Sequence, residues 1–267
     1  MARILAITNQ KGGVGKTTTA VNLGAALARR GRRVLLVDVD PQGNTTSGLG
    51  IEKSDLECCI YDAVLGSKPV TSVLVGTSVS GLDLVPATLR LAGAEVELVS
   101  ALARERRLAK ALAPLLESYD FILIDCPPSL GLLTMNALAA AQGVLVPIQC
   151  EFYALEGLGQ LMQVVEMVRE HLNPDLAVQG VLLTLYDSRL NLSEQVAEEV
   201  RRHFGPLVYH TVIPRNVKLA EAPSFGKPVI EYDAGSRGAR AYLELAREVD
   251  ENEEARLGTR SVRTPAR

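Results

Sequence analysis

A glycine-rich segment near the amino terminus carries residue types that could bind phosphate. It reads Gln10-Lys11-Gly12-Gly13-Val14-Gly15-Lys16-Thr17-Thr18 and follows an apolar run over residues 3–9. Glycines allow several backbone N–H groups to converge on one anion, and a helix starting at Thr17 would add the positive end of its dipole. Lys16 supplies a mobile charge for the outer phosphates, and the hydroxyl of Thr17 is placed to bind Mg²⁺. The segment therefore predicts a phosphate-binding loop between a strand and a helix.

Aspartates at the ends of two further apolar runs are candidates for the rest of a phosphoryl-transfer site. Transfer of a phosphoryl group to water needs charge neutralisation, a metal ion and a positioned nucleophile. Asp125 ends the run over residues 119–125, which is the setting of a Walker B acid that binds Mg²⁺ through water. Asp40 ends the run over residues 34–40. Asp38, two residues earlier, has the same side-chain direction, and for Asp38 a structural role is the alternative. An isolated aspartate at a strand end can also be a turn residue. The two aspartates therefore indicate a phosphoryl-transfer site only because they occur together with the phosphate-binding loop.

Alternating strand and helix patterns must position these groups. Such alternation predicts an α/β fold, a mostly parallel doubly wound sheet with helices on both faces and ligands at the carboxyl ends of its strands. The loop, Asp40 and Asp125 all fall at such ends. The expected strands cover residues 3–9, 34–40, 82–86, 119–125, 143–147, 178–184, 207–212 and 229–231. The expected helices cover residues 17–28, 58–65, 94–116, 132–141, 154–171, 192–204 and 237–254.

Other stretches give weaker signals. Residues 41–50, rich in Gly, Thr and Ser, are expected to form a mobile loop beside the phosphate site, and residues 52–80 suggest no chemistry. Four arginines, at positions 29, 30, 32 and 33, lie where they would favour the negative end of the first helix dipole. We expect a single domain over residues 1–257 and a disordered polar tail over residues 258–267.

Composition limits the classes of function. The chain has 267 residues, of which 47% are hydrophobic and 22% charged, and its net charge is −3. This balance argues against coating of nucleic acid through bulk charge but allows a local basic patch. Its four cysteines lack metal-ligand spacing and are interpreted as reduced thiols. The apolar stretch over residues 130–148 is interrupted by polar residues, so no membrane span is expected, and no signal peptide fits the first residues.

The loop departs from the standard phosphate-loop pattern in an informative way. Gln10 stands where the first glycine of G-x-x-x-x-G-K-[ST] belongs, and Lys11 is a second lysine at the front of the loop. This resembles the deviant Walker A loop of the ParA/MinD ATPase superfamily, a branch of the P-loop NTPase fold. The resemblance extends to about residue 249 and is most specific for the ParA/Soj-type partition ATPases of chromosomes or plasmids.

The resemblance implies roles for individual residues. Asp38-Val39-Asp40-Pro41-Gln42 matches switch I, so Asp40 would position the attacking water, and Asp125-Cys126-Pro127-Pro128 matches switch II. Lys11 would reach the partner's phosphates across an ATP-bound homodimer. Pro214 and Asn216, in Ile213-Pro214-Arg215-Asn216, would contact adenine. The cofactors implied are ATP and Mg²⁺, held by Lys16, Thr17, Asp125 and the loop residues Lys11, Gly12, Gly13, Val14, Gly15 and Thr18.

The resemblance further implies a slow ATPase used as a switch in DNA segregation. In its ATP-bound dimer it would bind double-stranded DNA non-specifically through phosphate contacts, and a ParB-type centromere-binding protein would stimulate hydrolysis. Candidate DNA contacts are Arg189, Lys218 and Arg215, with Lys227, Arg237 and Arg240 as weaker ones. The expected location is the cytoplasm, on the nucleoid.

Alternatives within the superfamily stay open in part. A MinD-like membrane-associated ATPase should end in a basic amphipathic helix, and this tail lacks such a face. A relative of the nitrogenase iron protein needs cluster-binding cysteines, which the spacing around Cys126 does not supply. The larger plasmid partition proteins carry a DNA-reading domain before the loop, for which the chain has no room. A metabolic ATP-dependent enzyme on the same fold remains an alternative.

Overall fold

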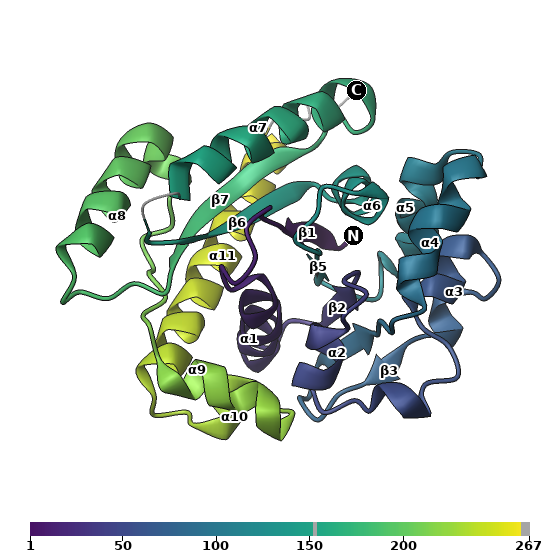
Figure 1. Cartoon of the computed structure of the whole chain (residues 1–267), viewed down its shortest axis with the longest axis horizontal. Coiled ribbons are helices and arrows are strands. Elements are labelled where there is room, and N and C mark those ends of the chain that lie inside the picture. The colour runs from purple at the N-terminus through teal and green to yellow at the C-terminus, as the bar shows by residue number, and fades with distance from the viewer. Residues whose placement is uncertain (152–153, 263–267) are drawn as a thin grey trace.

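The computed structural model describes residues 1–151 and 154–262, and its centre is a seven-stranded sheet (Figure 1). The strands lie in the spatial order β3-β4-β2-β5-β1-β6-β7. Pairing between these strands is parallel except between β3 and β4. The strands are β1 (Arg3–Ile7), β2 (Val34–Asp38), β3 (Val75–Gly76), β4 (Leu82–Val85), β5 (Phe121–Asp125), β6 (Gly143–Gln149) and β7 (Ala177–Thr184).

The register of the central strands brings the predicted chemistry to one edge of the sheet. Ile7 of β1 pairs with Asp125 of β5, and Asp125 pairs with Asp38 of β2. The three strands therefore end at the same level, where the glycine-rich loop begins. All three are buried along their length, which explains their continuous apolar sequences, because helices cover both faces of a parallel sheet.

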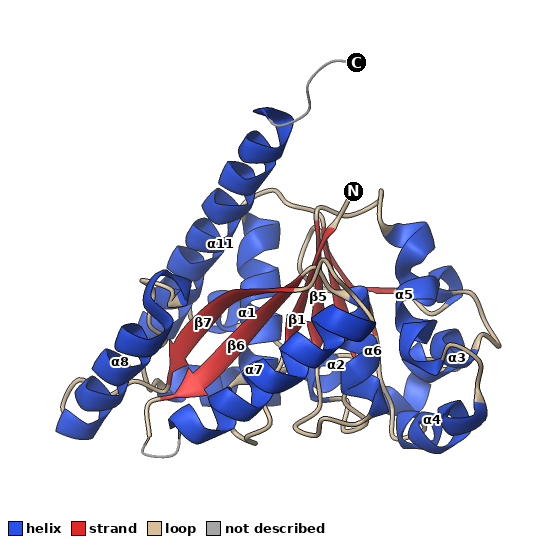
Figure 2. Cartoon of the chain, turned by 90° about the horizontal axis from the view of Figure 1, so that it is seen from above, coloured by secondary structure: helices blue, strands red, loops and turns tan. Residues whose placement is uncertain are grey.

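Helices form a layer on each side of the sheet (Figure 2). Along β1, Leu5 and Ile7 pack toward α1 and α9 to α11, whereas Ile4 and Ala6 pack toward α3 to α8. This alternation is the two-residue period of a strand buried on both faces. The helices are α1 (Lys16–Arg29), α2 (Asn44–Gly48), α3 (Ile60–Leu65), α4 (Leu91–Glu97), α5 (Arg107–Leu112), α6 (Leu132–Ala140), α7 (Ala154–His171), α8 (Asn191–Phe204), α9 (Val217–Glu221), α10 (Val229–Tyr232) and α11 (Arg237–Val262). No helix in these described ranges has the length and apolar character needed to cross a bilayer.

The long helix α11 is held against α1 by charge and by a buried tyrosine. Asp250 accepts hydrogen bonds from Arg30 Nε at 3.1 Å and from Arg32 Nε at 2.7 Å. Tyr242 is buried, and its hydroxyl lies 3.2 Å from that of Thr19 on α1. The attribution of these arginines to the helix dipole is therefore incomplete, because Arg30 and Arg32 form ion pairs with a specific carboxylate.

Two predicted strands are wrong. Residues 207–212 pair with the sheet edge through an isolated bridge between Val181 and Val208 and form no strand. The next two backbone N–H groups, of His210 and Thr211, donate to the carboxylate of Glu248 on α11 instead of to a neighbouring strand. Residues 229–231 lie in α10, where the N–H of Val229 donates to the Asn22 side chain on α1.

Three further boundaries differ from the predictions. The single helix expected over residues 94–116 is broken, because Ala103 has a left-handed φ of 51° and the Asn136 side chain accepts the N–H of Leu108. The loop expected over residues 41–50 contains α2. The last helix continues to Val262, past the expected start of a disordered tail at residue 258, and residues 263–267 lie outside the described ranges. Figure 2 shows the end of α11 extending beyond the sheet.

Candidate functional site

The glycine-rich loop is shaped by glycines with positive φ and by anchors on neighbouring strands. Gly13 has φ of 74° and Gly15 of 88°, a region that favours glycine. The Thr184 hydroxyl at the end of β7 donates to the carbonyl of Val14 at 2.9 Å. Asn9 accepts the N–H of Lys11 at 3.0 Å. The first turn of α1 has no side-chain cap, so its N–H groups remain available to an anion, as the sequence predicts.

Lys16 is a nearly buried cation held inside this loop. Lys16 is only 7% exposed, and its Nζ donates a hydrogen bond to the backbone carbonyl of Lys11 at 3.0 Å. Burial lowers the pKa of the Lys16 ammonium, and the nearby charges of Asp125, Cys126 and Asp40 partly offset this effect. A cation in this position is compensated by anions, and terminal phosphates would supply them.

Asp125 has one oxygen engaged and one free. Oδ2 accepts hydrogen bonds from the hydroxyls of Thr17 at 2.8 Å and Thr45 at 2.7 Å. Oδ1 is buried, with no hydrogen-bond partner among the described residues. Mg²⁺ is bound in proteins by one or two oxygen groups together with water and substrate phosphates. The hydroxyl of Thr17 and the free oxygen of Asp125 fit this ion, and both were predicted; Thr45 was not, because no motif marks it.

The two aspartates of switch I are used differently. Asp38 accepts hydrogen bonds from the N–H and the hydroxyl of Thr46 at 2.9 and 2.8 Å, and so holds the start of α2. Burial, and next the charge of Asp125, raises the pKa of Asp38. Asp40 is largely buried, and its Oδ1 accepts the N–H of Gln42 at 2.9 Å. The structural alternative for Asp38 is thus supported, and Asp40 stays the candidate for positioning water.

Lys11 is engaged outside its own loop. Its Nζ lies 3.1 Å from Oε2 of Glu151, and the other oxygen of Glu151 accepts from Gln149 at the end of β6. Both partners of this ion pair are partly exposed, so the pair is weak and can be exchanged for a phosphate. Lys11 therefore remains a candidate for contact with a partner's nucleotide.

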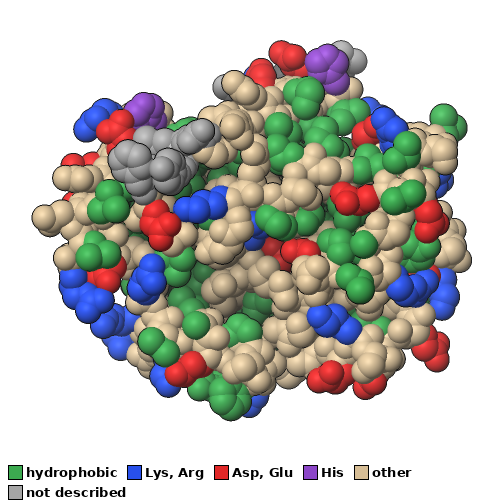
Figure 3. Space-filling view, viewed as in Figure 1, with side chains coloured by type: hydrophobic (Ala, Val, Ile, Leu, Met, Phe, Trp, Pro, Cys, Tyr) green, Lys and Arg blue, Asp and Glu red, His purple; other side chains and the backbone are tan. Residues whose placement is uncertain are grey.

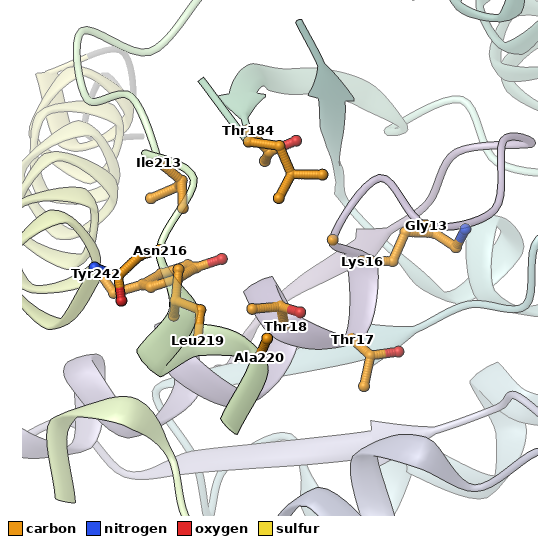
Figure 4. Close-up of a pocket in the computed structure, with 12 residues that line it drawn as sticks. Gly13, Lys16, Thr17, Thr18, Thr184, Ile213, Asn216, Leu219, Ala220 and Tyr242 are labelled. Atoms are coloured by element: carbon orange, nitrogen blue, oxygen red, sulfur yellow. The ribbon is translucent and has the colours of Figure 1, made fainter. Parts of the chain in front are cut away.

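A cavity of about 260 Å³ continues from the loop toward the carboxyl-terminal part of the chain. Figure 4 shows Lys16 at one end and Ile213, Leu219 and Tyr242 at the other, where an apolar base would fit. Asn216 lines this end, and its Oδ1 accepts the N–H of Lys218 at the start of α9. Pro214, the other predicted adenine contact, is not among the residues that line the cavity. Leu219 and Tyr242 were not predicted from the sequence as cavity residues, because apolar residues at these positions are typical of the buried face of a helix.

The candidate DNA contacts lie beside two carboxylates, those of Asp187 and Glu221. Arg189 is exposed and binds Asp187 through Nε at 2.8 Å and Nη2 at 2.7 Å. The Arg189 hydrogen bonds, and to a smaller extent the nearby charge of Arg215, hold the pKa of Asp187 well below its usual range. Lys218 pairs with Glu221 at 2.9 Å on α9. In Figure 3 several Lys and Arg side chains gather at the lower left, on the side of α8 and α9 in Figure 1.

Comparison with known proteins places these features in a family. The family model described as an AAA domain matches residues 2–178. The sporulation initiation inhibitor protein Soj of Bacillus subtilis is 61% identical over 94% of this chain and 100% of its own length. The chromosome partitioning protein ParA of Myxococcus xanthus is 57% identical over 93% of this chain and 88% of its own length.

A solved structure is similar over almost the same extent. Cobyrinic acid a,c-diamide synthase from Mycobacterium smegmatis, with a bound ATP analogue and magnesium, is 43% identical to this chain. The match has a TM-score of 0.82 and covers 92% of this chain and 93% of that one.

Proposed function

The chain belongs to the AAA domain family and, within it, to the Soj and ParA chromosome-partitioning ATPases, and we propose that it is a nucleotide-driven switch in DNA segregation. Binding of Mg-ATP would close a homodimer with DNA affinity, and slow hydrolysis would release the DNA. The observation that carries this proposal is the loop site, in which Lys16 and Thr17 line one end of the cavity and Thr17 donates a hydrogen bond to Asp125, whose other oxygen is free.

The residues of the site divide the work of hydrolysis. The loop N–H groups and Lys16 would bind the phosphates, and Thr17 and Asp125 would hold Mg²⁺, which would neutralise charge on those phosphates. Asp40 directs the attacking water, and the base lies between Ile213, Leu219 and Tyr242. Asp40 is the only candidate that the described residues offer for activating water, which suits slow turnover that awaits a ParB-type partner.

The dimer and its DNA contact are supported by two surface features. Lys11 lies at the outside of the loop, paired with Glu151, where a second subunit can reach it. Arg189, Arg215 and Lys218 would contact DNA phosphates from one side of the molecule and keep the protein on the nucleoid. Contacts of this kind are independent of sequence and weaken as salt rises.

Measurement of phosphate release tests this proposal. We expect slow, Mg²⁺-dependent hydrolysis by the chain alone and a large increase when a ParB-type protein and duplex DNA are added together. Lys16→Ala should abolish hydrolysis while circular dichroism shows an unchanged fold. High turnover without a partner, or stimulation by lipid vesicles in place of DNA, would contradict the partition function.

The metabolic alternative is tested in the same assay. The identity to cobyrinic acid a,c-diamide synthase is 43%, against 61% to Soj, which favours the partition function. Cobyrinic acid with ammonia as a nitrogen donor should therefore leave the rate of phosphate release unchanged. A strong increase with these substrates would identify a synthase.

A further inference from the structure

An apolar groove lies on the side of the sheet away from α1 and α11. It is a cavity of about 590 Å³ between α4, the start of α6 and the end of α7. We call it the α4–α7 groove, and its lining includes Val99, Leu130, Leu132, Met135, Met167 and Leu172. The nucleotide site uses none of these residues.

Apolar side chains around this groove are unusually exposed. Val99 in its lining is 59% exposed and Met167 is 48% exposed. Val96 on α4 and Leu102 just beyond it are 75% and 88% exposed. In Figure 3 hydrophobic side chains gather at the upper right, where Figure 1 places the end of α7 beside α6. Exposed apolar side chains in and beside a groove are typical of a protein-binding site.

The groove also carries one acidic group without a partner. Arg104 in the lining is neutralised by Glu105, 2.8 Å away. Glu95, also in the lining, forms no ion pair or hydrogen bond within the described ranges. A partner with a basic side chain beside apolar ones would complement this arrangement.

The groove adjoins the segment that follows switch II. Leu130 and Gly131 belong to its lining and connect Asp125 and its following residues to α6. Oε1 of Glu95 lies so close to Gly131 that a Cβ added there would be 2.3 Å from it. A molecule bound in the groove therefore contacts the segment that leads from the metal-binding aspartate.

We propose that the α4–α7 groove is the docking site through which the stimulating protein partner acts on hydrolysis. The occupant is an amphipathic segment with apolar side chains for Val99 and Met167 and a Lys or Arg for Glu95. This inference rests on the proposed partition function, to which it adds the place and chemistry of partner contact. The occupant contacts Leu130 and Gly131, and through these residues its binding shifts the position of switch II.

Substitutions at exposed positions test the site without disturbing the core. Val99→Glu combined with Met167→Glu should lower partner-stimulated ATP turnover at least about tenfold. Basal hydrolysis, ATP-dependent dimerisation and DNA binding should match the wild type. Leu207→Glu is the matched control, because Leu207 is an exposed leucine outside the groove, and it should retain full stimulation.

The charge of the groove provides a second test. Glu95→Lys should lower stimulation, and it should reduce the salt dependence of partner binding, whereas Glu117→Lys, an exposed acid outside the groove, should not. Full stimulation of both groove variants would overturn the docking site and leave the partition function standing. Loss of ATP-dependent dimerisation would show instead that the groove contacts a second copy of the chain. Failure of the partner to stimulate the wild type would overturn the partition proposal, and the docking site with it.

Discussion

The two carboxylate oxygens of the buried Asp125 differ, because one accepts hydrogen bonds and the other has no hydrogen-bond partner among the described residues. The hydroxyls of Thr17 and Thr45 hold Oδ2, which fixes the direction of the carboxylate. Oδ1 is left buried without a partner among the described residues, a costly state unless a cation completes it. The position of this atom beside the phosphate loop is the strongest sign of a magnesium site.

Replacement of this carboxylate should therefore act through the metal. We expect Asp125→Asn to weaken Mg-ATP binding by about 10- to 100-fold, the range found when groups around a metal are changed. Binding of ATP with EDTA should change much less. Titration calorimetry with and without Mg²⁺ measures both, and an equal loss under the two conditions would argue against a metal role.

Asp38 should make the nucleotide-free protein sensitive to pH. Burial, and next the charge of Asp125, raises the pKa of Asp38 from an ordinary value of 3.8 to about 7. A carboxyl whose pKa is raised by folding contributes stability below its ordinary pKa, and this contribution is lost as pH rises through the raised value. As the pH rises from about 4 to about 7, the free energy of unfolding of the wild-type protein should therefore fall relative to that of the Asp38→Asn variant.

Urea denaturation at a series of pH values provides the measurement. Asp38→Asn also weakens the hydrogen bonds from Thr46, so its curve should be displaced at every pH, but its slope against pH should be smaller. Parallel curves for the two proteins would show that Asp38 does not retain its proton in the folded state.

Among the secondary-structure elements, the apolar runs predicted the parallel sheet and the place of the active-site residues at the carboxyl ends of its strands. The predicted runs over residues 34–40 and 119–125 contain β2 and β5, which are strands because their residues are buried on both faces, although β2 ends at Asp38 and not at Asp40. The run near Val208 has a similar composition, yet Glu248 on α11 accepts the N–H groups that a strand would have used. Such competition from a distant side chain has no local signal in the sequence.

The same limit applies to the site. The loop, Thr17 and Asp125 lie in contiguous motifs, so the phosphate end could be predicted in detail. The base end is assembled from separate segments, and Tyr242 and Leu219 contribute there from helices α11 and α9. Tyr242 is buried against α1 and Leu219 against α11, so both have the sequence character of core residues.

Two glycines of β7 and α7 provide a matched test of packing. A Cβ on Gly180 would lie 2.4 Å from the ring of buried Tyr209, so Gly180→Ala should lower the free energy of unfolding by about 1–3 kcal/mol. Gly159 in α7 has no atom within 4 Å of the same position, so Gly159→Ala should raise it by about 0.5–1 kcal/mol. Denaturation of both variants in urea checks the pair, and an unchanged Gly180→Ala protein would contradict the contact.

At the scale of the whole molecule, the candidate surfaces surround the nucleotide site. Lys11 extends from the loop to Glu151, Arg189 and Lys218 are exposed near the base end, and the α4–α7 groove adjoins switch II. Each surface thus lies beside a part of the nucleotide site. This arrangement suits a protein whose nucleotide controls its assembly.

We propose that ATP produces a dimer that binds DNA, and two variants separate the steps of this process. Asp40→Ala should keep ATP bound but prevent hydrolysis, which traps the assembled state. Gly12→Val is the matched control. No atom lies within 4 Å of a Cβ at Gly12, so the monomer can accept the side chain, but a second subunit should be excluded.

Sedimentation of both variants with Mg-ATP, with and without non-specific duplex DNA, is the most direct measurement. We predict that Asp40→Ala forms a dimer that sediments with DNA at low salt and releases it at high salt, and that Gly12→Val stays monomeric and free of DNA. An Asp40→Ala protein that stays monomeric with ATP, or a dimer indifferent to DNA at every salt concentration, would contradict the partition switch.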